Sequence, residues 1–201
     1  MAAAKDNPEA AIIAPRLLNE DGSLQPSHKT GLYKREAHPT KYTAPEGDIC
    51  AEFLSGALWL VRMEVLRNTG FFDPEIFFYY EDDDLCMRLR AVGYSLMLVH
   101  DATAIHGMGK SSVPSPASRA FRLYHDTWSR LYIEYKYRGI PAARTMATQK
   151  LSKYRFRLFL GRAAFIRPLV TRYGPRLQAT KDFLLYLSTR DIKARPAAHY
   201  C

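Results

Sequence analysis

The segment FFYYEDDDLCMRLRAVGYSLMLVH, residues 77–100, decides the fold class because a helix pattern passes directly into a strand pattern. From Leu85 onward, apolar residues recur at spacings of four and three, which predicts a helix over residues 82–92. Gly93 ends this helix, and the apolar run at residues 94–100 is typical of a strand. A helix and a strand joined this closely indicate a fold of the α/β class.

The neighbouring segments extend this pattern. AAIIAPRLL (residues 10–18) predicts a strand, and FLSGALWLV (53–61) predicts a buried strand with a bulge at Gly56. RMEVLRNTG (62–70) predicts a short helix closed by its final glycine. Residues 28–48 are polar and contain glycines and prolines, so we expect a long surface loop there.

The composition excludes several classes of protein. A hydrophobic share of 47% is typical of a globular chain rather than a disordered one. No apolar run reaches the roughly 18 residues of a membrane-spanning helix, and the N-terminus lacks a signal-peptide pattern. The cysteines at positions 50, 86 and 201 are too widely spaced for a zinc or disulfide framework, which favours a reduced, cytoplasmic setting.

Charge divides the chain into two parts. Residues 1–117 hold 11 Lys/Arg and 16 Asp/Glu, whereas residues 118–201 hold 18 Lys/Arg and 4 Asp/Glu. The Pro/Ser-rich segment VPSPAS (113–118) lies where the balance changes, so we predict domains at 1–117 and 118–201. In the second part we expect helices that end near Gly139 and Gly174, with a third helix after them. Such a basic helical region favours a polyanionic partner.

Four carboxylates, Glu81 to Asp84, stand where the predicted helix begins. The positive end of the helix dipole keeps such carboxylates ionised, and an ionised carboxylate near an acceptor hydroxyl acts as a general base. A carboxylate cluster also suits a divalent cation. The alternative is helix capping, which needs only one or two of the four acids. His106, in a glycine-flanked loop, is either a metal or phosphate contact or an ordinary loop histidine.

An ordered series of motifs over about sixty residues resembles the C-terminal half of the catalytic domain of family 2 glycosyltransferases. The similarity is greatest to the rhamnosyltransferase-like enzymes of cell-wall and surface-polysaccharide assembly. The matching landmarks are Gly56-Ala57, Arg62, Gly70, Phe72-Asp73, Phe77–Tyr80, Glu81 to Leu85, Arg88 to Tyr94, His106, Gly109 and Ser111.

This resemblance implies a partial GT-A-like fold, with a mixed sheet and flanking helices, followed by the basic helical tail. It also implies a nucleotide-sugar donor, a divalent metal (Mg²⁺ or Mn²⁺), and inversion by direct displacement onto a glycan or lipid-linked acceptor. The implied roles are base for Asp82, orientation or binding of the acceptor for Glu81 and Asp84, metal or diphosphate contact for His106, and substrate contacts for Gly56, Ala57, Trp59, Arg62 and Asp83.

One part of the family pattern is not present. The D-x-D-like motif that grips the metal and the donor diphosphate has no counterpart, and no glycine-rich phosphate loop replaces it. We therefore expect the N-terminal nucleotide-binding half to be missing and the chain to be inactive alone. The alternative function is a non-catalytic remnant that binds a membrane surface or a protein partner.

The basic part favours an anionic membrane. In KLSKYRFRLFLGRAAFIRPLV (150–170), apolar residues fall near one helical face with Lys and Arg along it, a pattern of interfacial helices. This predicts a peripheral location on the inner face of the cytoplasmic membrane. Packing on the catalytic domain is the alternative, and no zinc or helix-turn-helix pattern supports nucleic acid. The residues of the expected membrane face are Leu151, Tyr154, Leu158, Phe165 and Leu169.

Overall fold

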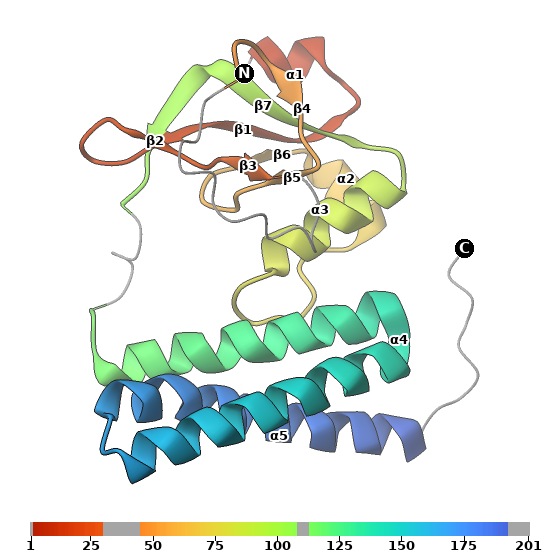
Figure 1. Ribbon diagram of the computed structural model, residues 1–201. Coiled ribbons are helices and arrows are strands. Elements are labelled where there is room, and N and C mark those ends of the chain that lie inside the picture. Colours follow the sequence, from red (N-terminus) through yellow and green to blue (C-terminus); the bar gives the residue numbers. More distant parts are fainter. Residues whose placement is uncertain (1, 30–44, 108–112, 193–201) are drawn as a thin grey trace. The chain divides into compact units, whose positions relative to one another are not determined.

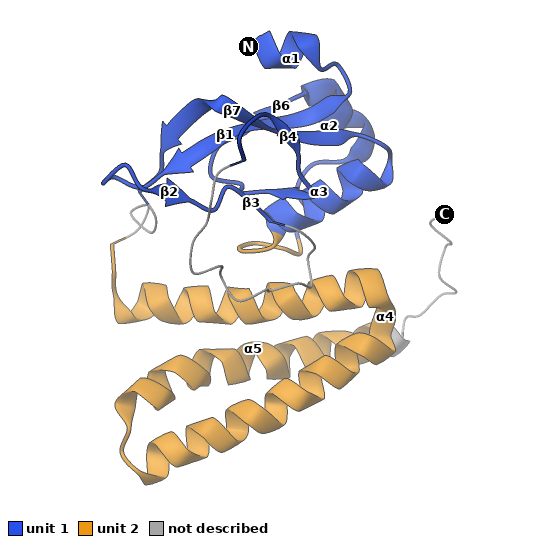
Figure 2. Ribbon diagram, turned by 45° about the horizontal axis from the view of Figure 1, so that its top comes forward, with its two compact units in different colours: residues 1–74, 81–112 blue, residues 75–80, 113–201 orange. Residues whose placement is uncertain are grey.

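The computed structural model describes residues 2–29, 45–107 and 113–192 (Figure 1). For residues 191 and 192 it describes the backbone only. The chain forms two compact units, one of residues 1–74 and 81–112 and one of residues 75–80 and 113–201 (Figure 2). We call them the sheet unit and the helical unit. The chain therefore leaves the sheet unit for the six residues Glu75–Tyr80 and then returns to it.

The sheet unit is built on a mixed five-stranded sheet with the order β2-β1-β7-β4, in which β6 also pairs with β1. Strands β1 and β7 are parallel, and the other pairs are antiparallel. A second, two-stranded sheet pairs β3 with β5. The elements are α1 (Ala2–Asp6), β1 (Ala10–Leu18), β2 (Leu24–Gln25), β3 (His28–Lys29), β4 (Ile49–Cys50), β5 (Phe53–Leu54), β6 (Leu60–Val61), α2 (Met63–Thr69), α3 (Glu81–Ala91) and β7 (Ser95–Ile105).

The helix-to-strand segment forms as predicted. Helix α3 ends at Ala91, and Gly93 adopts the left-handed φ of 92° that turns the chain into β7. Leu85 and Leu89 are fully buried, together with Leu96 and Leu98 of β7, so this segment supplies much of the core. Val92 follows the last helical residue and is exposed, contrary to its expected place on the apolar face.

The single strand expected over residues 53–61 is wrong. The segment forms two short strands with different partners, since β5 pairs with β3 while β6 pairs with β1. A turn at Gly56-Ala57 separates them. Only the long-range pairing distinguishes this arrangement from one bulged strand. Of the loop expected at residues 28–48, positions 30–44 lie outside the described residues.

The helical unit consists of α4 (Pro116–Ala163) and α5 (Arg167–Ile192). Helix α4 starts with a capping box, in which Ser115 and Ser118 each bond the other's backbone N–H. Gly139, with φ 81° and ψ 176°, breaks the helical path two residues before Pro141, so the expected end appears as a kink.

The helix end expected at Gly174 is wrong, because α5 continues through Gly174 and Pro175. A proline ring clashes with the Cβ of a preceding helical residue, and glycine has no Cβ, so the helix passes this position. Pro168 falls at the start of α5, where a proline's missing N–H has no cost.

The apolar face expected to meet a membrane is used for packing inside this unit. Tyr154 and Leu158 are buried against Leu177 of α5, and Leu151 packs beside them. Phe165, which the helical pattern placed on the same face, is 91% exposed. It lies between α4 and α5 with a left-handed φ of 55°, outside both helices.

The aromatic segment before α3 belongs to the helical unit. Ile76 is buried, the Trp128 indole N–H donates to the Glu75 carbonyl, and the Ser129 hydroxyl donates to the Phe78 carbonyl. Phe77 contacts the rings of Phe121 and His125 on α4. The aromatic residues and the acids that follow them in sequence therefore lie in different compact units.

Candidate acidic site at the start of helix α3

All four carboxylates lie in the first turn of α3. Asp83 and Asp84 are buried, whereas Glu81 and Asp82 are partly exposed. Because α3 packs on the sheet and turns directly into β7, its first turn lies toward the carboxyl end of β7. The carboxyl ends of parallel strands are where open α/β sheets bind ligands.

Asp82 is held by two backbone N–H groups. Its Oδ2 accepts from Gly56 N at 3.1 Å, and its Oδ1 accepts from Asp83 N at 2.9 Å. A Cβ at Gly56 would lie 3.0 Å from the Asp82 Cβ and 3.4 Å from Oδ2, so a larger residue there would displace the carboxylate. Two residues 26 positions apart, both singled out from the sequence, thus form one contact.

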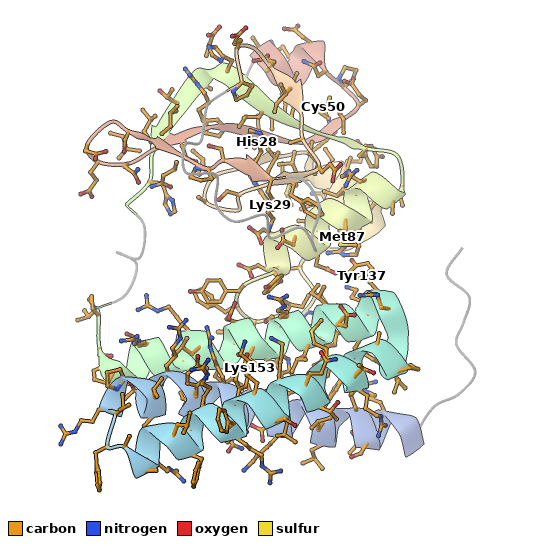
Figure 3. The ribbon with its side chains drawn as sticks, viewed as in Figure 1. His28, Lys29, Cys50, Met87, Tyr137 and Lys153 are labelled. Carbon is orange, nitrogen blue, oxygen red and sulfur yellow. The ribbon has the colours of Figure 1, made fainter. Side chains whose placement is uncertain are left out.

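Asp83 and Asp84 each pair with a cation. Asp83 Oδ1 lies 2.5 Å from Nζ of Lys29, a residue of β3 that is labelled in Figure 3. Asp84 Oδ2 accepts from Arg88 Nε at 2.9 Å, and the Arg88 guanidinium also donates to the backbone carbonyls of Thr69, Gly70 and Phe71. The Asp84–Arg88 pair therefore ties α3 to the end of α2. This geometry favours a structural role for Asp84 over contact with an acceptor.

Glu81 differs from Asp82 in its electrostatics. Burial raises the pKa of the Glu81 carboxyl, and the negative charges of Asp82 and Asp83 raise it further. Its Oε2 is buried and has no hydrogen-bond partner among the described residues. Glu81 is therefore easier to protonate than an ordinary glutamate. Asp82 differs from it in accepting hydrogen bonds from two backbone N–H groups.

Two expected substrate contacts, Arg62 and Ala57, have surroundings that do not indicate substrate binding. Arg62 donates to the carbonyls of Ala4, Asn7 and Ala10, so it fixes the N-terminal segment against β1. Ala57 is exposed in the turn beside Gly56.

Trp59 stacks on Phe72 with ring centroids 6.4 Å apart. Its indole Nε1 is buried and has no acceptor in the part of the chain that the structure describes. Phe72 itself is 52% exposed, so this pair is a partly open aromatic surface rather than core.

His106 lies at the carboxyl ends of the parallel strands. The backbone N–H of His106 donates to the carbonyl of Leu18, and its ring Nδ1 lies 3.0 Å from Gln25 Oε1. The Gln25 amide in turn donates to His106 O and to Asn19 Oδ1. Gly109 and Ser111, the remaining residues of this expected motif, lie outside the described residues.

The described residues do not form a metal centre. Within residues 2–29, 45–107 and 113–192, no three His, Cys, Asp or Glu side chains are grouped to hold a metal ion. The His106 ring has the Gln25 side-chain amide as its partner. The metal remains a prediction of the resemblance.

Sequence reasoning missed Lys29, Gln25 and Arg88. Arg88 had a usable signal, because it follows Asp84 by four residues on a helix. Lys29 and Gln25 had none, since each meets a partner that is far away in the sequence.

The sequence of this chain is similar to that of known proteins. Two curated proteins of Mycobacterium tuberculosis, from strains CDC 1551 / Oshkosh and ATCC 25618 / H37Rv, are each named N-acetylglucosaminyl-diphospho-decaprenol L-rhamnosyltransferase. Each is 26% identical over 165 residues, covering 69% of this chain. This chain is a distant homologue of a rhamnosyltransferase. It spans 54% of the length of these relatives.

No family model matches the chain. The mixed α/β fold of the sheet unit is consistent with part of a glycosyltransferase domain. Across the described helices, none combines the length and apolar character needed to cross a bilayer.

Proposed function

We propose that the sheet unit carries the acceptor-activating part of an inverting, family 2 glycosyltransferase of the GT-A type. In the reaction, the Asp82 carboxylate takes the proton of an acceptor hydroxyl. The hydroxyl oxygen forms a bond to the anomeric carbon of the sugar as the bond from that carbon to the diphosphate breaks. The diphosphate leaves with the bonding electron pair, and the sugar inverts its configuration.

The contact between Asp82 and Gly56 carries this proposal. A general base must be held in position, and two backbone N–H donors fix the Asp82 carboxylate while its side chain stays partly exposed. Among the four acids, Asp83 and Asp84 are already paired with Lys29 and Arg88. Glu81, with its raised pKa, suits a hydrogen bond to the acceptor beside Asp82.

Trp59 is the best placed of the expected sugar contacts. Its buried indole N–H has no acceptor among the described residues and lies next to the exposed ring of Phe72, so the pair offers a donor and a stacking face together. We propose that these two rings contact the substrate. Arg62 and Ala57 are not used in this scheme, because Arg62 bonds backbone carbonyls and Ala57 only flanks the Gly56 turn.

The donor is proposed to be a nucleotide sugar with Mg²⁺ or Mn²⁺ on its diphosphate, with His106 near them. The described residues supply no complete metal ligand set, so no step above uses a cation. The acceptor is proposed to be a cell-envelope glycan or a lipid-linked sugar, because the relatives are named for a diphospho-decaprenol acceptor. Such an acceptor favours a peripheral site on the inner face of the cytoplasmic membrane.

The decisive test is transfer of L-rhamnose from a nucleotide donor to an N-acetylglucosaminyl-diphospho-polyprenol, measured with the expected nucleotide-binding half supplied to the chain. Asp82→Asn keeps the size and one acceptor oxygen but removes the base, so the rate should fall about 10²–10⁴-fold. The matched control is Glu64→Gln, which neutralises an exposed acid in the first turn of α2. Equal rates in Asp82→Asn and the unchanged protein would refute the base assignment.

Gly56→Ala tests the supporting contact. The added Cβ must push Asp82 away, and we expect a rate loss of about tenfold with little change in the amount of folded protein. Gly47→Ala is the control, since a Cβ there meets nothing within 4 Å. Loss of activity in both variants to the same extent would remove the special role of Gly56.

A further inference from the structure

The second half of α4 and the turn after it expose large aromatic side chains. Phe156 is 60% exposed, Phe159 is 66% exposed and Phe165 is 91% exposed, while Ile166 beside it is 43% exposed. We call these four residues the aromatic tip. Exposure of this kind in neighbouring apolar residues marks an interaction surface more often than an isolated exposed residue does.

Apart from Phe165, the aromatic tip is not part of the face that the sequence pattern indicated. A helix turns by about 100° per residue, so Phe156 and Phe159 lie on the side of α4 opposite Tyr154 and Leu158. Tyr154 and Leu158 are buried against α5, which accounts for the packing of the helical unit. The aromatic tip is left with no packing role among the described residues of that unit.

Basic residues flank the tip on both sides. By the same helical spacing, Arg155 and Arg162 lie along one edge of Phe156 and Phe159, and Lys153, labelled in Figure 3, lies with Arg157 along the other. All four cations are exposed. Arg167 and Arg172, at the start of α5, are exposed as well.

The surrounding sequence contains no acid. Residues 135–181 hold 12 Lys/Arg and no Asp or Glu, so nothing within this stretch neutralises the charge beside the tip. Burial lowers the pKa of Lys150 to about 8, and the nearby cations lower it further against the opposing charge of Asp126.

We propose that the aromatic tip and its flanking Arg and Lys residues form a docking surface for an anionic phospholipid bilayer, with Phe156, Phe159, Phe165 and Ile166 inserted at the level of the headgroups. Interfacial helices combine these features: aromatic or aliphatic side chains on one face and Lys/Arg beside them. Anionic headgroups provide the charge that the protein itself lacks here.

A bilayer fits these residues better than nucleic acid does. Four apolar side chains projecting from a helix end and a turn gain most from a continuous apolar phase, which a bilayer provides. A nucleic acid would use the cations but would leave Ile166 and part of the Phe surface in water. This inference builds on the membrane partner in the proposed function and specifies the residues that meet it.

The test is sedimentation of the purified chain with vesicles of phosphatidylglycerol and phosphatidylcholine, against vesicles of phosphatidylcholine alone. We expect binding to the anionic vesicles only, weakened by salt because screening reduces the attraction. Phe159→Ser should weaken binding about five- to tenfold, since it removes one inserted ring. Arg155→Gln should weaken it about fivefold by removing one charge.

Leu185→Ser is the matched control. Leu185 is 66% exposed, the same fraction as Phe159, but lies far along α5 from the tip. It should leave binding unchanged. An equal loss in Leu185→Ser and Phe159→Ser, equal binding to both vesicle types, or no binding to either would overturn the inference.

Binding of single-stranded RNA that drops in Phe159→Ser while vesicle binding does not would overturn it too, in favour of a nucleic acid. These outcomes are separate from the fate of the proposed reaction. The variants change residues of the helical unit only, so the sugar-transfer assay with a soluble acceptor analogue can succeed or fail independently of docking.

Discussion

The two units use charge in opposite ways. In the sheet unit, carboxylates sit in defined bonds, as in the Asp84–Arg88 pair at 2.9 Å and the Asp82–Gly56 contact at 3.1 Å. In the helical unit, cations such as Arg155 and Arg162 lie exposed on helix surfaces. Where a charge is held by specific bonds, a single substitution should have a large effect. Where many exposed charges attract the same partner, each single substitution should have a smaller effect. The expected effects of mutations differ accordingly.

The largest effect should come from Arg88→Met. It removes the guanidinium partner of the fully buried Asp84 and the bonds to the end of α2, so the sheet unit should lose about 3–5 kcal/mol of stability. The chain has two tryptophans, and Trp59 lies in the sheet unit while Trp128 lies in the helical unit. Denaturation followed by Trp59 in a Trp128→Phe background measures this loss.

A second probe is the Cys86 thiol. Burial raises its pKa to about 12, so it should resist alkylation in the native protein and react once Arg88→Met opens the core. Adding Asp84→Asn to Arg88→Met should restore part of the stability, because no charge is then left buried. A single Arg88→Met variant as stable as the unchanged protein would contradict the structural role of this pair.

In the helical unit, the most sensitive position is predicted to be a glycine rather than a charge. A Cβ at Gly161 would lie 2.7 Å from Leu169 Cβ and 3.3 Å from Val170 N, where α4 and α5 approach closely. Gly161→Ala should therefore cost about 1–3 kcal/mol. Denaturation followed by Trp128 in a Trp59→Phe background checks this, and an unchanged midpoint would show that the helices separate at no cost.

The smallest effect should be that of Glu81→Gln on stability. The pKa of Glu81 is raised in the folded state. The free energy of unfolding therefore decreases as pH rises through that pKa, because the buried carboxyl ionises. Removing the charge should raise Tm slightly at neutral pH, and the gain should vanish at acidic pH, where Glu81 is protonated anyway. Thermal unfolding of both proteins at several pH values tests the sign. A gain confined to low pH would reverse the assignment.

Much of the local structure could be predicted from the sequence. The strand at residues 10–18, the short helix capped by Gly70 and the helix–Gly93–strand segment form where their patterns indicate. Each depends on neighbours a few residues apart, so adjacent sequence encodes it. The division of the strand at residues 53–61 could not be predicted, because it follows from two different distant partners.

The candidate site divides in the same way. The sequence placed four carboxylates at a helix start and pointed to Gly56 and His106, but it could not assign their neighbours. The structure pairs Asp84 with Arg88, Asp83 with Lys29 and His106 with Gln25, and it leaves Asp82 against Gly56. Selection among equivalent-looking acids thus comes from long-range contacts.

By itself, the sequence determined the α/β class, the split between acidic and basic parts and the acid cluster at a helix start, because each is written in residue type and short spacing. Tertiary structure decided that Glu75–Tyr80 packs with the helices rather than with the acids. It also decided which face of α4 is buried. Those outcomes depend on which segments, far apart in the sequence, bury their apolar surfaces against each other. Periodicity alone cannot decide which of two apolar faces of one helix is buried.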